Sequence, residues 1–275
     1  MTSPNTTRIA FIGFGEVGQR FSDDLMRGGG VALSTFDIVF DDDAKRDARL
    51  ARASALSVTP APTAADAARG SHIVISAVTA DVAENVARHA AGYLAPGQIY
   101  LDVNSASPDT KRRAADVVQA CGAHYVEGAV MAPVKVPGIK VQILAGGPMA
   151  AETSRWLNTL GMNLTPVSIE HGRASAMKLC RSIMIKGLEA LIVDCAAATK
   201  HWNVESEVYA SLAATFPSID WPALADNMAE RVATHGIRRA AEMREAAEML
   251  ECLGRDPGLA RAVADAQQRG ARPKT

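Results

Sequence analysis

The sequence predicts an α/β fold, with a doubly wound parallel sheet first and an all-helical part after it. Up to about residue 167, short β-branched runs alternate with Ala-rich, charge-dotted segments, as in a sheet covered by helices. After Pro166 the strand-like runs stop, and helix-forming Ala, Met, Leu, Glu and Arg dominate. We therefore expect two domains, residues 1–167 and 168–275.

The elements of the first domain follow in order, each closed by turn residues such as Gly122 or the Gly146, Gly147 pair. Strands are expected at Arg8–Ile12, Leu33–Asp37, His72–Ala77, Ile99–Val103, His124–Glu127 and Val141–Ala145. Helices are expected between them at Val17–Arg27, Ala44–Ala55, Val82–Ala91 and Asp109–Cys121.

The second domain is expected to contain two long helices. Gly172–His201 is apolar around most of its circumference, which is typical of a helix buried between domains or subunits. Asn227–Leu253 has the pattern of a charged amphipathic helix, and the last twenty residues resemble a frayed polar tail. A buried apolar helix in a small domain favours a homodimer.

Composition excludes several classes of protein. With 48% hydrophobic and 21% charged residues the chain is ordinary for a globular protein, and its net charge of −1 gives no broad positive field for nucleic acid or an anionic membrane. The most apolar stretch, Gly187–Ala198, is shorter than the roughly 20 residues that span a bilayer. We expect no membrane segment.

Cysteine usage and the N-terminus indicate a cytoplasmic protein. The four cysteines form no CxxC pair and have no ligand-like spacing to histidines, which favours reduced thiols and no metal site. Met1–Thr7 is short and polar, and Ile9–Gly13 is too short for a signal-peptide core.

A GxGxxG motif lies between the first expected strand and the first expected helix. Gly13 permits the tight turn, Gly15 lets the backbone approach a pyrophosphate, and Gly18 lets helix and strand pack closely. Free N–H groups at the helix start meet the negative charge. The alternative is a purely structural glycine turn. The motif predicts a nicotinamide dinucleotide site that contains Gly13, Phe14, Gly15, Glu16, Val17 and Gly18.

Asp37 bears on the choice between NAD and NADP. It ends the second strand, where a carboxylate accepts hydrogen bonds from ribose hydroxyls and repels a 2′-phosphate, so NAD is favoured. Lys45 and Arg46 follow soon after and could instead hold a phosphate. Both cofactors stay open.

Four further segments carry a family resemblance. They are Asp102–Pro108 (DVNSASP), Tyr125–Pro133 (YVEGAVMAP), Ile143–Gly147 (ILAGG) and Gly172–Lys178 (GRASAMK). In this order they resemble the two substrate loops, the strand ending in Gly-Gly and the GxGxxxK pattern of the β-hydroxyacid dehydrogenase superfamily, which includes 3-hydroxyisobutyrate and 6-phosphogluconate dehydrogenases. The resemblance covers most of the chain and is firmest before residue 200.

The resemblance implies an oxidoreductase in which Lys178 is the catalytic lysine. At the start of an apolar helix, desolvation would favour the neutral amine that a general base requires. The resemblance also places Asn104 and Ser105 at the substrate or nicotinamide, and Val78 and Thr79 at the cofactor. The alternatives are a helix-surface lysine and, for the turn, helix caps.

Departures from the family pattern indicate a divergent branch and a different substrate. The second glycine of GxGxxxK is Ala174, the usual Ser-Gly-Gly is Met131–Pro133, and Arg181 and Ser182 stand where an asparagine is usual. The candidate substrate contacts are Met131, Arg181, Ser182, His235 and Arg238.

Two of these candidates suit an acidic substrate. The planar fork of Arg181 fits a carboxylate or phosphate, although it could instead bridge to Glu189. His235 and Arg238 could close over the site or form a solvated helix face. The leading hypothesis is an NAD(P)-dependent dehydrogenase of a small β-hydroxy acid. The alternatives are an imine or carbonyl reductase of the same architecture and a non-catalytic NAD(P)-binding regulator.

Overall fold

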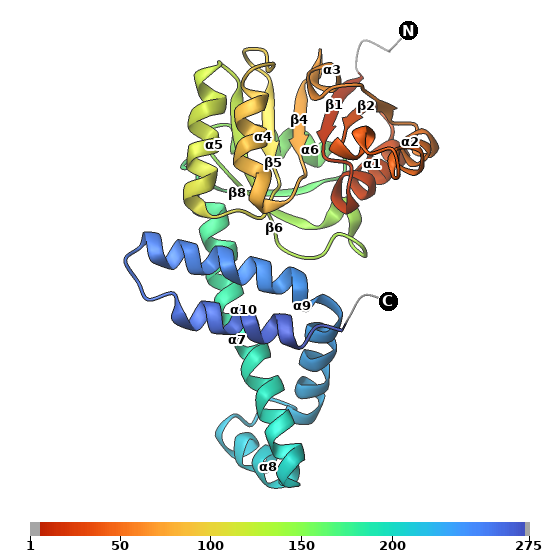
Figure 1. Cartoon of the computed structure of the whole chain (residues 1–275). Helices are drawn as coiled ribbons and strands as arrows, with labels where there is room; N and C mark the ends of the chain where they lie inside the picture. The colour runs from red at the N-terminus through yellow and green to blue at the C-terminus, as the bar shows by residue number, and fades with distance from the viewer. Residues whose placement is uncertain (1–5, 273–275) are drawn as a thin grey trace. The chain divides into compact units, whose positions relative to one another are not determined.

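The computed structural model describes residues 6–272 and divides into two compact units, Met1–Ala176 and Met177–Thr275 (Figure 1). The first is α/β and the second is helical, as the sequence predicts. The first unit extends past residue 167 because it also contains the last strand and the first turn of a long helix, α7 (Arg173–Trp202).

The sheet of the first unit has eight strands in the order β3-β2-β1-β4-β5-β6-β7-β8. The strands are β1 (Thr7–Ile12), β2 (Val31–Phe36), β3 (Thr59–Pro60), β4 (Ile73–Ser76), β5 (Ile99–Asp102), β6 (His124–Val130), β7 (Gln142–Gly146) and β8 (Asn163–Ser168). Neighbouring strands are parallel except at β6 and β7, which are antiparallel. The carboxyl ends of β1, β2, β4, β5 and β6 therefore share one edge of the sheet, where ligands bind in doubly wound folds.

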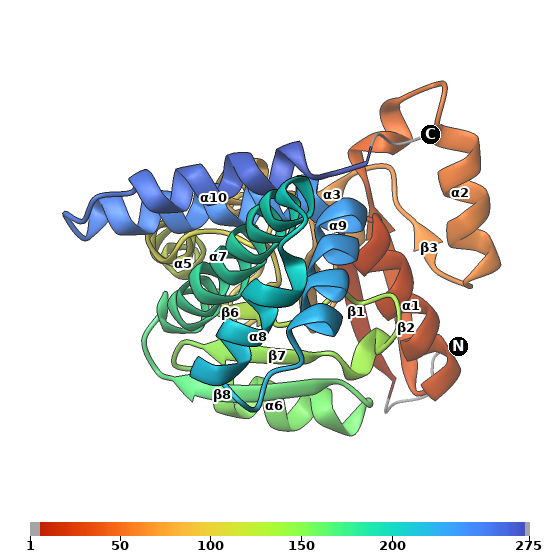
Figure 2. The same cartoon turned by 90° about the horizontal axis from the view of Figure 1, so that it is seen from below.

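Helices cover both faces of this sheet. They are α1 (Glu16–Gly28), α2 (Arg46–Ala55), α3 (Ala64–Ala68), α4 (Ala83–Ala90), α5 (Pro108–Ala120) and α6 (Ala150–Thr159), with single 3-10 turns η1 (Ile38–Asp41), η2 (Ala80–Val82) and η3 (Gly138–Lys140). One apolar core packs α1, α2 and α6 on the sheet, and a second packs α3, α4 and α5. Figure 2 shows α5 and α6 on opposite sides of β6, β7 and β8.

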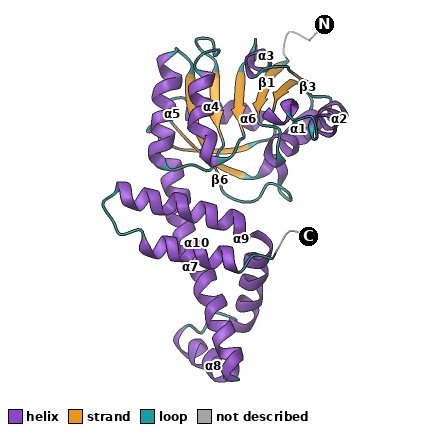
Figure 3. Cartoon of the chain, in the orientation of Figure 1, coloured by secondary structure: helices purple, strands orange, loops and turns teal. Residues whose placement is uncertain are grey.

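The second unit contains the rest of α7 together with α8 (Glu205–Thr215), α9 (Trp221–Cys252) and α10 (Gly258–Arg269). Figure 3 shows helices and loops in its described part, residues 177–272. The expected frayed tail is wrong, since α10 packs along α9 and buries Val263 and Gln267. Among residues 6–272, no helix combines the length and apolar character needed to cross a membrane.

Four short elements of the first unit were not predicted. The strands β3 and β8 lie at the two edges of the sheet, and β8 contains Pro166, which an edge strand tolerates. The helices α3 and α6 are short, with five and ten residues. Weak periodicity over so few residues leaves little signal in the sequence.

Candidate active site

The glycine motif forms the turn between β1 and α1 that the sequence predicts. Gly13 has a φ of +94°, and a Cβ there would lie 2.4 Å from the carbonyl oxygen of Ala77. A Cβ on Gly18 would lie 2.4 Å from the carbonyl oxygen of Gly13. Around Gly15, in contrast, no atom lies within 4 Å of the Cβ position. Packing thus requires the outer two glycines, while the central one borders open space.

This open space adjoins the start of α1. The helix begins at Glu16, which is exposed, and continues through the half-buried Val17. Gly15 is the N-cap and has no side chain to bind the first N–H groups of the helix. Those N–H groups and the positive end of the helix dipole form a site for a phosphate. The residues present therefore fit the pyrophosphate of a dinucleotide.

Asp37 holds the glycine turn from the end of β2. It is 8% exposed, and its Oδ2 accepts a hydrogen bond of 2.6 Å from the N–H of Phe14. Its Oδ1 accepts one of 2.9 Å from the N–H of Val39. Each oxygen retains a second lone pair for a ribose hydroxyl, so the predicted contact with the cofactor stays a prediction.

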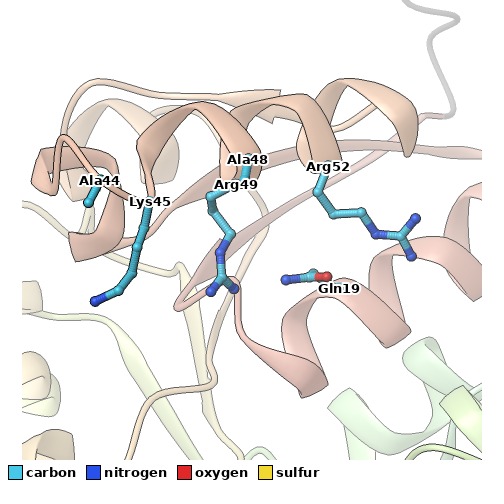
Figure 4. A pocket seen from close by; sticks show the side chains of 6 residues that line it. All are labelled: Gln19, Ala44, Lys45, Ala48, Arg49 and Arg52. Carbon is cyan, nitrogen blue, oxygen red and sulfur yellow. The ribbon is translucent and has the colours of Figure 1, made fainter.

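A basic pocket of about 340 Å³ lies between α1 and α2 (Figure 4). It is lined by Gln19, Ala44, Lys45, Ala48, Arg49 and Arg52. The Arg49 guanidinium and Gln19 Nε2 both donate to the carbonyl oxygen of Phe14, so the pocket adjoins the glycine turn. Of the two predicted cations, Lys45 lines the pocket, whereas Arg46 contacts Asp43 and the carbonyl of Phe40.

The sequence analysis missed Arg49 and Arg52 in this pocket. A signal was present, because Lys45, Arg49 and Arg52 are spaced by four and three residues and therefore share one face of a helix.

Asn104 connects two loops at the carboxyl edge of the sheet. Its side chain is 3% exposed; Oδ1 accepts from the N–H of Val78 at 2.6 Å, and Nδ2 donates to Ser76 Oγ at 3.0 Å. These contacts give Asn104 a role in holding the turn after β5 against the turn after β4. Ser105 is half-buried beside it, and Thr79 is exposed at the start of η2. The ligand contacts predicted for these residues stay predictions.

A buried ion pair lies at the same carboxyl edge of the sheet, at the end of β5. Lys111, which is 0% exposed, donates from Nζ to Asp102 Oδ1 at 2.8 Å and to the Asp102 carbonyl at 2.9 Å. The hydroxyl of Tyr125 donates to Asp102 Oδ2 at 2.7 Å, and burial raises the pKa of Tyr125 well above its usual value. Tyr125 also packs against Tyr100, and the ion pair was not foreseen from the sequence.

In the second unit, a cluster of charges joins α7 and α9. Lys186 Nζ contacts Glu242 Oε2 at 2.7 Å and donates to Ser182 Oγ at 3.0 Å. Arg238 pairs with the same carboxylate. Burial raises the pKa of Glu242, but the charges of Lys186, Lys178 and Arg238 outweigh it and lower the pKa overall.

The cluster contains three of the predicted site residues, Lys178, Ser182 and Arg238. Lys178 is half-buried, whereas Arg181 and His235 are exposed. Met131 lies in the first unit, half-buried just after β6. Glu189, the alternative partner of Arg181, is instead bound by Arg239 and Arg231.

Comparison with known proteins identifies the family. A model described as the NAD binding domain of 6-phosphogluconate dehydrogenase matches residues 8–167. The chain belongs to this family, within the β-hydroxyacid dehydrogenase superfamily. A second model, described as a domain of unknown function (DUF1932), matches residues 187–270.

Three solved structures are similar to this family member. A conserved hypothetical protein from Sinorhizobium meliloti 1021 is 39% identical, with a TM-score of 0.84 over 96% of this chain and 88% of that one. The conserved protein MTH1747, of unknown function, is 30% identical, with a TM-score of 0.78 over 96% and 97%. Mycobacterium tuberculosis 3-hydroxyisobutyrate dehydrogenase is 15% identical, with a TM-score of 0.79 over 96% and 93%, and shares the fold.

Proposed function

We propose that the protein is an NAD(P)-dependent oxidoreductase that transfers a hydride between the nicotinamide ring and a small β-hydroxy acid. The observation that carries the proposal is the glycine turn, in which Gly13 and Gly18 are fixed by packing while Gly15 borders open space at the start of α1. The bound dinucleotide would supply the hydride acceptor or donor. Membership of a dehydrogenase family supports this chemistry.

The proton of the reaction is assigned to Lys178. When an alcohol is oxidised, a base must remove the hydroxyl proton as the hydride leaves carbon; in the reverse direction the ammonium returns the proton. Lys178 stands in the segment that resembles the family's lysine motif and belongs to the cluster around Glu242. A carboxylate on the substrate would suit the guanidinium groups of Arg181 and Arg238, which the sequence offers as substrate contacts.

Replacing Lys178 tests the assignment. Lys178→Ala should lower kcat by about 10²- to 10⁴-fold with a panel of β-hydroxy acids, the range expected for loss of a general base. Binding of NADPH, followed by its fluorescence, should be unchanged. Equal turnover by the two proteins would overturn the role of Lys178. Turnover of imines but not of hydroxy acids would favour the reductase alternative, and cofactor binding without any turnover would favour a regulator.

For the cofactor we propose NADP, although Asp37 in the sequence favoured NAD. Asp37 can still accept from a ribose hydroxyl, but three cations line the pocket beside the glycine turn, and one of them, Lys45, also pairs with Asp42. A pocket with Lys45, Arg49 and Arg52 would neutralise a 2′-phosphate.

The double variant Lys45→Met/Arg52→Met tests this preference without touching the Arg49 contact to the turn. It should weaken NADPH binding about tenfold or more and leave NADH binding unchanged, as loss of phosphate contacts predicts. Arg46→Met, on the same helix but outside the pocket, is the matched control. Tighter binding of NADH than NADPH by the wild type would restore the role of Asp37 in selecting NAD.

We further propose a homodimer formed through α7. Met184, Leu188 and Leu191 are exposed and recur at spacings of four and three residues, so they form an apolar row along the helix. A second copy would cover this row. Leu188→Glu should therefore abolish the dimer, which light scattering would detect.

A cytoplasmic location with reduced thiols stays a prediction.

A further inference from the structure

Glu127 on β6 binds the start of α7. The residue is 0% exposed. Its Oε2 accepts a hydrogen bond from the N–H of Gly172, and its Oε1 accepts one from the N–H of Ser175, both at 2.6 Å. Each oxygen thus pairs with one of the N–H groups that a helix leaves without a partner at its start.

The surroundings are shaped around this carboxylate. A Cβ on Gly146 would lie 2.7 Å from Glu127 Oε2, so a side chain at that position would push the carboxylate out of place. Gly172 has a φ of +90°, and a Cβ there would lie 3.1 Å from the carbonyl oxygen of Pro108. Ala174 of α7 packs with Ala129 of β6 and Leu144 of β7. The first turn of α7 is therefore built into the sheet of the first unit.

The charge of Glu127 also suits this place. The first turn of α7 has no acidic residue of its own, and a negative charge there stabilises the positive end of the helix dipole. Both oxygens of Glu127 are used on backbone N–H groups. Burying a carboxylate is costly unless hydrogen bonds and favourable charge offset the lost hydration, and here two N–H groups and the helix dipole do so.

We propose that Glu127 is a positioning residue that holds Lys178 for proton transfer by anchoring the first turn of α7. Lys178 follows Ser175 by three residues, about 4.5 Å along the helix axis. This inference rests on the proposed role of Lys178.

A double-mutant cycle tests it. Glu127→Gln keeps the shape but replaces one acceptor by an NH2 group that faces an N–H donor. It should lower kcat about tenfold, as small misplacements of reacting groups do, with the Kd for NADPH unchanged. In a Lys178→Ala background the same change should cost nothing further, because the two residues act as a unit. Equal losses in both backgrounds would overturn the proposal.

Two further variants serve as controls. Glu127→Asp keeps the charge but withdraws it by one methylene, and should give an intermediate kcat. Asp220 is the N-cap of another long helix, α9, and its Oδ1 accepts a hydrogen bond from the N–H of Ala223. Asp220→Ala removes this cap and should leave kcat unchanged. A kcat equal to wild type in both Glu127 variants would also overturn the proposal.

A second readout does not depend on turnover. The rate at which an acetylating reagent modifies Lys178, measured by mass spectrometry, should change in Glu127→Gln while that of the exposed Lys200 does not. If the wild type oxidises no β-hydroxy acid but the acetylation rate of Lys178 still changes in Glu127→Gln, the proposed function fails, and the proposal that Glu127 positions Lys178 is kept. If Lys178 reacts as in the wild type, the anchor fails.

Discussion

Lys111 in the first unit and Lys186 in the second are both buried lysines paired with a carboxylate, but their surroundings differ. Lys111 also donates to the backbone carbonyl of Asp102, and the Asp102 carboxylate also accepts a hydrogen bond from Tyr125. Apolar cores lie on both faces of the sheet beside this pair. Lys186 and Glu242 lie among further charges, and burial lowers the pKa of Lys186 although Glu242 opposes this.

The difference shows two uses of buried charge. At the sheet edge a single pair fixes one turn near the cofactor. In the helical unit, Glu189 is bound by Arg239 and Arg231, and by Gln267 of α10, so one carboxylate connects three helices. Four of the eleven buried residues of α9 are alanine, which contributes little apolar area. We infer that charge pairing holds the second unit together to a greater extent than the first.

The largest expected effect comes from breaking the Glu189 connection. Glu189→Gln would leave two guanidinium groups without a buried counter-charge, and we expect unfolding of the second unit to become easier by about 3–5 kcal/mol. Trp202 and Trp221 report on this unit when Trp156 is replaced by Phe, so urea unfolding followed by their fluorescence measures the change. Glu230→Gln, at an exposed pair with Arg272, is the control and should show no resolvable change. Equal stabilities of the Glu189 variant and the parent would refute the comparison.

A smaller effect is expected in the first unit. Asp102→Asn removes the charge opposite Lys111 but leaves its Nζ two acceptors, the remaining Oδ1 and the Asp102 carbonyl, and should therefore cost about 3 kcal/mol, the low end of the range for a broken buried ion pair. Tyr125→Phe removes one hydrogen bond to the same carboxylate and should cost about 1 kcal/mol. With Trp202 and Trp221 changed to Phe, Trp156 reports on this unit alone. A cost for Asp102→Asn above that for Glu189→Gln would reverse the ranking of the two units.

The two units also differ in how far the sequence predicted them. In the first, local signals sufficed: β-branched runs marked the central strands, and the glycine spacing marked the turn at Gly13, whose φ of +94° favours glycine. The roles of Asp37 and Asn104 were less accessible, because the sequence does not show that their oxygens are used on the N–H groups of Phe14 and Val78.

In the second unit the decisive contacts join residues far apart in the chain. Glu189 and Arg239 are 50 positions apart, and neither has a local pattern that marks it as buried. Glu127 and Ser175, at 48 positions, are a similar case in the first unit. The helix α10 was missed because its N-cap, Pro257, has no side-chain hydrogen bond to the helix and its sequence is polar outside a narrow buried face. Burial by a distant partner leaves no periodic signal in the segment itself.

The smallest effect concerns acid. Burial raises the pKa of Glu242, but the positive charges of Lys186, Lys178 and Arg238 lower it by more. The pKa in the folded protein therefore lies below the ordinary value of 4.5. A lowered pKa stabilises the fold above the unfolded value, and this contribution is lost as the pH falls through the folded value. In Glu242→Gln the loss of Tm between pH 5 and pH 3 should therefore be smaller than in the parent. Glu248→Gln, exposed on the same helix, should follow the parent; if Glu242→Gln follows it too, the cluster does not stabilise the carboxylate.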